Sequence, residues 1–128
     1  QPMSQLAYAL DSQPSVQPQP VLLCRQQDLV PFSGVAARFA EHAIALFYLP
    51  GQQVELYGVS HLDPASGAPV MAHGLIGESG GEFYIAAPLH KQQYRLSDGQ
   101  CLSDSALKLQ VFAVQLQHGQ VWLLPPTE

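Results

Sequence analysis

Charged side chains are scarce in this sequence, and positively charged ones are the scarcest. Charged residues make up 12% of the 128 residues, with five Lys and Arg against ten Asp and Glu. The basic residues are scattered and the formal net charge is -5, so no basic patch can neutralise the phosphates of a nucleic acid. An acidic chain is also not attracted to anionic lipids. We therefore expect neither a nucleic-acid nor a membrane partner.

Long apolar runs and cysteines are also few. The longest apolar run, 43–49, is far short of the roughly 18–20 residues that span a bilayer. Cys24 and Cys101 form no C-x-x-C pair, so we expect buried thiols, with a disulfide or a reactive thiol as the open alternatives. The first residues show no basic segment followed by an apolar one, and we expect a cytoplasmic protein without a secretory signal.

Apolar residues, in contrast, are abundant at 47% of the chain. A chain of this length fits one globular domain whose core needs neither metal nor disulfide. Residues 1–20 are rich in Gln, Pro and Ser, a composition typical of extended, flexible segments. We interpret 1–20 as a flexible leader, 21–124 as the domain and 125–128 as a short C-terminal tail.

The domain consists of short strand-like segments separated by Pro and Gly turns. Its tight His118-Gly119 turn indicates a hairpin. Strands are predicted at 21–24, 35–39, 43–49, 54–59, 82–86, 93–96, 107–117 and 120–124, and single helical turns at 26–29 and 104–107. This pattern predicts a mainly β fold, a small antiparallel sandwich or barrel.

Two irregular stretches, 60–77 and 86–91, interrupt the strands. Loops of this kind on a rigid β scaffold are where functional residues concentrate. The run 63–67 (Asp-Pro-Ala-Ser-Gly) and the run 87–90 (Ala-Pro-Leu-His) resemble the C-P-H-x-G and C-P-x-H loops of Rieske domains. Those two loops protrude from the fold and hold a [2Fe-2S] cluster through two Cys and two His.

The resemblance places Asp63, Ala65, Ala87 and His90 at the four ligand positions. Ala65 and Ala87 offer no donor atom, and neither cysteine lies in the two loops. A [2Fe-2S] cluster needs four ligands. We therefore predict a Rieske-like fold that holds no cluster, with the four positions as vestiges of the ligand set.

Several short segments match the sequence pattern of one family. They lie at 63–64, 74–77, 81–82, 87–92 and 95–102. In this order and spacing the chain resembles the small subunits of assimilatory NAD(P)H-dependent nitrite reductases. The resemblance implies a large subunit that carries FAD, siroheme and a [4Fe-4S] cluster and reduces nitrite to ammonium in nitrate assimilation.

No catalytic residue is expected on this chain. It has no G-x-G-x-x-G fingerprint for a dinucleotide and no set of cysteines for siroheme attachment. The expected role is therefore to support or dock on the large subunit. The tip of the second loop, with Pro88, Leu89 and Lys91, is the predicted docking site because it combines apolar and basic side chains, with a solvated loop end as the open alternative.

A different class of function is also open. His61, Asp63, His73 and His90 lie in or near the two loops, and two imidazoles with one carboxylate can hold a metal such as non-haem iron. The alternative is thus a stand-alone Rieske-like binding module for a metal or small ligand in the cleft between the loops.

Overall fold

The computed structural model describes residues 19–125. Most of the predicted leader and tail, 1–18 and 126–128, lies outside the described residues. The elements in chain order are β2 (Val21–Arg25), η1 (Gln26–Asp28), β3 (Ser33–Phe39), β4 (His42–Tyr48), β5 (Leu56–Ser60), η2 (Met71–His73), β6 (Leu75–Ser79), β7 (Glu82–Ala86), β8 (Gln93–Arg95), β9 (Val111–Phe112), β10 (Val114–Gln117) and β11 (Gln120–Leu123). Among them, no helix is long and apolar enough to cross a bilayer.

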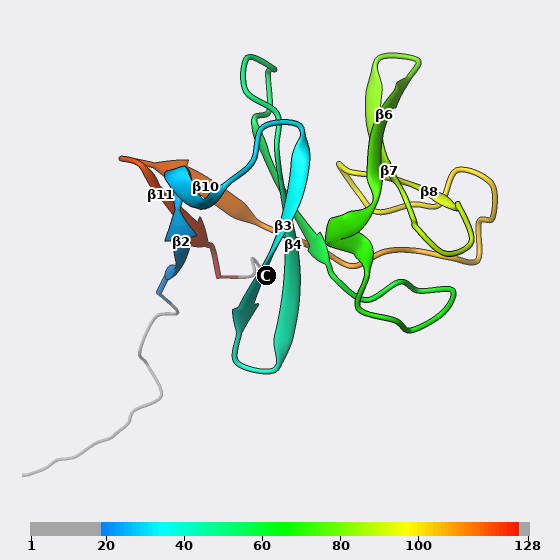
Figure 1. The fold of residues 1–128 in the computed structure, drawn as a ribbon, viewed down its shortest axis with the longest axis horizontal. Helices are drawn as coiled ribbons and strands as arrows, with labels where there is room; N and C mark the ends of the chain where they lie inside the picture. The colour runs from blue at the N-terminus through cyan, green and yellow to red at the C-terminus, as the bar shows by residue number, and fades with distance from the viewer. Residues whose placement is uncertain (1–18, 126–128) are drawn as a thin grey trace, which may run out of the picture.

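The strands form three antiparallel sheets that stand next to one another (Figure 1). Their strand orders are β10-β11-β2, β3-β4-β5-β9 and β6-β7-β8. In Figure 1 the four-stranded sheet lies between the other two. This arrangement confirms the predicted mainly β antiparallel fold.

Strand β4 explains how one sheet can serve two cores. Ile44 and Leu46 point to one face and Ala45 and Phe47 to the other, because side chains alternate along a strand. All four are fully buried. An apolar run without polar alternation is therefore what the central strand requires, and this is why 43–49 is the longest such run in the sequence.

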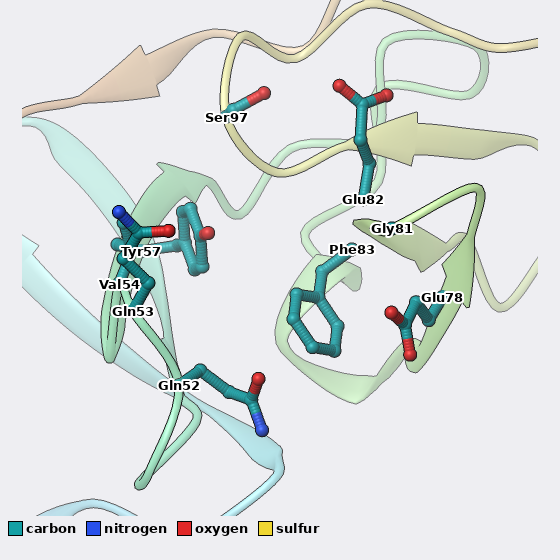
Figure 2. A pocket seen from close by; sticks show the side chains of 9 residues that line it. All are labelled: Gln52, Gln53, Val54, Tyr57, Glu78, Gly81, Glu82, Phe83 and Ser97. Carbon is teal, nitrogen blue, oxygen red and sulfur yellow. The ribbon is translucent and has the colours of Figure 1, made fainter.

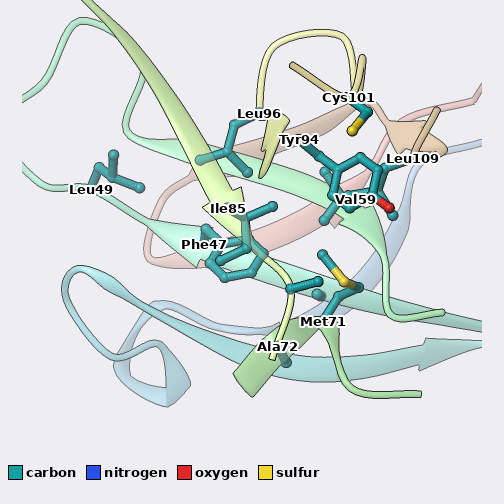
Figure 3. Close-up of a cluster of buried hydrophobic side chains, with 12 residues drawn as sticks. Phe47, Leu49, Val59, Met71, Ala72, Ile85, Tyr94, Leu96, Cys101 and Leu109 are labelled. Atoms are coloured by element: carbon teal, nitrogen blue, oxygen red, sulfur yellow. The ribbon is translucent and has the colours of Figure 1, made fainter. Parts of the chain in front are cut away.

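Two apolar clusters fill the spaces between the sheets. One joins Ile44 and Leu46 to Val121 and Leu123 of β11. The other lies between the four-stranded sheet and β6-β7-β8, and Figure 3 shows it. The buried members of this second cluster are Ala45, Phe47, Leu49, Val59, Met71, Ala72, Ile85, Ala87, Tyr94, Leu96, Cys101 and Leu109.

Most predicted strands are found, but three segments differ from the prediction. The stretch 60–77, expected to be irregular, contains η2 and the first half of β6. Gly77 interrupts the strand pattern in the sequence; glycine is required there because the Tyr84 ring occupies the place where a Cβ would lie. The predicted strand 107–117 is broken into β9 and β10, and the predicted helical turn at 104–107 is not helical.

Both cysteines are free thiols. Cys101 is buried, as predicted, whereas Cys24 is only half-buried. Burial, with a smaller effect of the Asp28 charge, raises the pKa of the Cys24 thiol. The open alternative of a disulfide is therefore wrong.

Candidate functional site

The first predicted loop closes on itself through backbone hydrogen bonds. The Asp63 amide donates to the Ala68 carbonyl at 2.9 Å, and the Gly67 amide donates to the Asp63 carbonyl at 2.6 Å. Gly67 adopts a φ of +76°, a conformation that glycine reaches without steric cost. At the base of the loop the Val70 amide donates to the His61 carbonyl at 2.9 Å. The loop thus keeps its shape through its own main chain.

The Asp63 side chain points into the domain and is fully buried. Its Oδ1 accepts a hydrogen bond from the Ala65 amide at 2.9 Å. Its Oδ2 and the Tyr94 hydroxyl are both buried, and neither meets strict hydrogen-bond geometry with any described residue. Burial, followed by the charge of Asp63 and a contact with its carboxylate, raises the pKa of Tyr94 to about 12. The two groups therefore lie close together, with Asp63 in the first loop and Tyr94 in β8.

The second loop is a tight turn between β7 and β8. The Lys91 amide donates to the Ala87 carbonyl at 3.1 Å, and the Ala87 amide donates to the Gln92 carbonyl at 2.8 Å. Lys91 adopts a φ of +65°, which costs a non-glycine residue roughly 1–2 kcal/mol. Ala87 is buried, while Leu89 and Lys91 face solvent. The turn holds its tip outward.

A surface that is mainly apolar lies where this turn meets the start of β6. A cavity of about 190 Å³ there is lined by Leu75, Pro88 and Lys91, among others. Leu75 is 74% exposed and Leu89 is 52% exposed. We call Leu75, Pro88, Leu89 and Lys91 the loop-end surface. Pro88, Leu89 and Lys91 are predicted from the sequence as docking residues. Leu75 lies in a segment that matches the family, but nothing in the sequence indicates that its side chain is exposed.

Of the four proposed metal-binding side chains, His61 and His73 lie next to each other. The rings of His61 and His73 are 5.9 Å apart between centroids, edge to face. His61 Nδ1 accepts a hydrogen bond from the Ala72 amide at 3.0 Å, and burial together with His73 lowers the pKa of His61. Within residues 19–125, no three His, Cys, Asp or Glu side chains come together as a metal site. The geometry gives no support to the metal-binding alternative.

Comparison with known proteins places this geometry in a family. The model of the Rieske-like [2Fe-2S] domain matches residues 19–124. The small subunit of nitrite reductase (NADH) from Escherichia coli K12 is 34% identical over 101 residues, which are 79% of this chain and 93% of that protein. The chain belongs to the nitrite reductase small-subunit family.

A solved structure of the family has the same fold. The crystal structure of a protein described as the small subunit of an NADPH nitrite reductase superposes with a TM-score of 0.79 at 38% identity. The match covers 84% of this chain and 99% of that one. The Rieske-like fold therefore extends over nearly all described residues.

A third relative of this small-subunit family is a segment of a longer protein. The nitrite reductase [NAD(P)H] large subunit of Klebsiella oxytoca is 36% identical over 117 residues. The match covers 91% of this chain but only 12% of that protein. In that organism a domain similar to this chain is therefore part of the large-subunit polypeptide.

The Rieske-like family raises the question whether a [2Fe-2S] cluster fits this small subunit. Of the four ligand positions, Ala65 and Ala87 carry only a methyl group, and the Asp63 carboxylate is directed to Ala65 and Tyr94. Cys24 lies in β2, and Cys101 forms a backbone β-bridge with Tyr94; both cysteines are outside the two loops. His90 is then the one ligand type that remains. The donor atoms at this end of the domain do not fit the cluster.

Proposed function

We propose that this chain is the small, cluster-free subunit of a NAD(P)H-dependent nitrite reductase that converts nitrite to ammonium in nitrate assimilation in the cytoplasm. One observation carries the proposal. In a member of the small-subunit family, the loops that lack metal-ligand atoms lie next to an exposed apolar surface. FAD, siroheme and [4Fe-4S] would reside on the large subunit. This chain then contributes to the oxidoreductase as a structural subunit without catalytic residues.

The Klebsiella relative supports a large subunit as the partner. A domain joined covalently to a large-subunit polypeptide is held at high effective concentration next to it. A separate small subunit must obtain the same proximity from a binding surface. We therefore expect the free-standing chain to carry a contact surface for the large subunit.

The loop-end surface has the properties of such a contact. Leu75 and Leu89 expose large apolar side chains, and Pro88 and Lys91 line the same cavity as Leu75. Apolar side chains at the centre of a patch with a charged residue beside them are typical of protein interfaces. Because the two loops are held by their own backbone hydrogen bonds, little conformational entropy is lost when the surface is covered.

The proposal is tested with the purified large subunit of the same organism. Nitrite-dependent oxidation of NADH and of NADPH is measured with and without this chain, and the mass of the mixture is measured by light scattering. We expect one complex that contains both chains and an activity that depends on this chain. If the two chains do not form a complex and the rate of nitrite-dependent NAD(P)H oxidation is the same with and without this chain, the proposal is contradicted.

A further inference from the structure

A second cavity lies at the other end of the β6–β7 hairpin from the loop-end surface. It is about 260 Å³ in volume and is formed by the tip of this hairpin, the loop between β4 and β5, and the residue Ser97 after β8 (Figure 2). Neither the family resemblance nor the proposed function assigns a role to this cavity. Its walls belong to two different sheets, so a ligand there would contact both.

Two aromatic rings form the walls of the cavity. Tyr57 comes from β5 and Phe83 from β7, and in Figure 2 their side chains extend from opposite sides. Both are half-buried and pack against the large apolar cluster, which fixes the rings in place. The face of an aromatic ring attracts a cation through its quadrupole.

Carboxylates and amides complete the lining, and no basic side chain takes part in it. Glu82 is paired with Arg95 at 3.2 Å, and Arg95 is also held by Asp98 at 2.9 Å. Glu78, in contrast, has no ion pair within the described part of the chain. The Gln52 side chain extends toward Phe83 and Glu78 in Figure 2. The cavity therefore combines an unpaired carboxylate with two aromatic rings in its lining.

We infer that this cavity takes the guanidinium group of an arginine side chain that the large subunit presents. A guanidinium stacks on aromatic faces and donates several hydrogen bonds to carboxylate and amide oxygens, whereas an ammonium is a point charge that holds its water more strongly. The inference rests on the proposed function, because it names a second contact with the same partner.

The source of the guanidinium follows from how open the cavity is. Val54 on its rim is 48% exposed and the Glu82 side chain is 58% exposed, so a free small cation would remain largely in water. A side chain brought by a protein is enclosed by the partner surface around it, which excludes that water. The five-residue strands of the hairpin separate this cavity from the loop-end surface by roughly 15 Å, a distance that one partner can cover.

The experiment compares binding of the large subunit to wild type, Glu78→Gln, Phe83→Leu and the control Glu41→Gln. Glu41 is an exposed carboxylate at the turn between β3 and β4, outside both surfaces. We expect affinity to fall about tenfold for Glu78→Gln, with a weaker dependence on salt than wild type. Phe83→Leu keeps an apolar side chain but removes the ring, and we expect it to bind less tightly as well. Glu41→Gln should bind like wild type.

A second arm titrates arginine amide into the isolated chain and follows the NMR signals of Tyr57, Phe83 and Ser97. We expect weak, fast-exchange shifts at these residues in wild type and none in Glu78→Gln. Tight binding of arginine amide with unchanged large-subunit affinity of Glu78→Gln would assign the cavity to a free ligand and overturn the inference. Wild-type affinity of both variants would overturn it while leaving the proposed function intact. Failure of the wild-type chain to bind the large subunit would instead overturn the proposed function.

Discussion

Asp63 in the first loop and Tyr94 in β8 are both fully buried, and the charge of Asp63 is, after burial, the next cause that raises the pKa of the Tyr94 hydroxyl. They connect the first loop to the strand that follows the second. In a Rieske domain a metal cluster joins the two loops. In this chain a buried carboxylate of the first loop and a buried phenol of β8 interact electrostatically at this end of the fold.

The coupling between these two side chains can be measured. Tyr94→Phe removes the buried hydroxyl whose proton the Asp63 charge helps to retain, and we expect it to lower the free energy of unfolding by about 0.5–3 kcal/mol. We expect Asp63→Ala to be destabilising as well and the double variant to lose less than the sum, with a coupling of about 0.5–3 kcal/mol. Urea denaturation of the four proteins measures it. Tyr84→Phe, a half-buried tyrosine of β7, should change stability little, and additive losses at 63 and 94 would refute the contact.

Tyr94 also predicts how stability changes at alkaline pH. Its pKa is raised from 10.0 to about 12 in the fold, chiefly by burial, so the folded protein retains the phenolic proton more strongly than the unfolded chain. The resulting stabilisation is present below pH 10 and is lost as the pH rises from 10 toward 12. Denaturation curves at these pH values should show a steeper loss for wild type than for Tyr94→Phe. Parallel curves would contradict the assignment.

The pKa of His61 predicts how the stability of the fold changes at acidic pH. Burial and the neighbouring His73 lower its pKa below the reference value of 6.5, so the fold favours the neutral ring that accepts from the Ala72 amide. The stabilisation is present above pH 6.5 and is lost as the pH falls below it. In His61→Asn the amide oxygen replaces Nδ1 as the acceptor, and we expect a flatter pH profile by urea denaturation.

The control for that experiment is His118→Asn. His118 is an exposed turn residue with a φ of +55°, a conformation that asparagine tolerates. This variant should retain the wild-type profile between pH 5 and 7. A wild-type profile in His61→Asn would show that another group is responsible for the acid dependence.

Because the two loops lack metal-ligand atoms at two of the four positions, we expect that the chain cannot assemble an iron-sulfur cluster. Incubation of the purified chain with ferrous iron and sulfide under anaerobic conditions should give no [2Fe-2S] absorption, because Ala65 and Ala87 supply no ligand. Iron and acid-labile sulfide analysis after desalting measures the outcome. Two equivalents of each retained with visible absorption would show that side chains outside the loops complete a ligand set.

Local sequence signals predict the fold well where side-chain alternation and turn chemistry agree. The strand at 82–86 and the hairpin at His118-Gly119 are found as predicted. Strand β6 is missed because Gly74, just before it, and Gly77, within it, look like turn residues, whereas in the fold atoms of β7 occupy the space where their Cβ atoms would lie. Such close approaches depend on the tertiary fold and leave only a turn-like pattern in the sequence.

For the candidate site, too, some features can be predicted from the sequence and others depend on the tertiary fold. The donor-free positions Ala65 and Ala87 can be identified from loop spacing alone, because that conclusion needs only residue types. The exposure of Leu75 cannot be identified in this way, since a leucine in a strand is ordinarily expected to be buried. The interaction of Asp63 with Tyr94 likewise depends on the tertiary fold, which no local pattern encodes.

The loop-end surface is the proposed contact with the large subunit. Its most direct test is calorimetric titration of the large subunit with Leu75→Ser/Leu89→Ser, with Leu22→Ser as the matched control. Leu22 is 48% exposed on β2, in a different sheet. Losing two buried leucines at an interface should weaken binding by at least tenfold, while Leu22→Ser should bind like wild type. Equal affinity of the double variant and wild type would contradict the account.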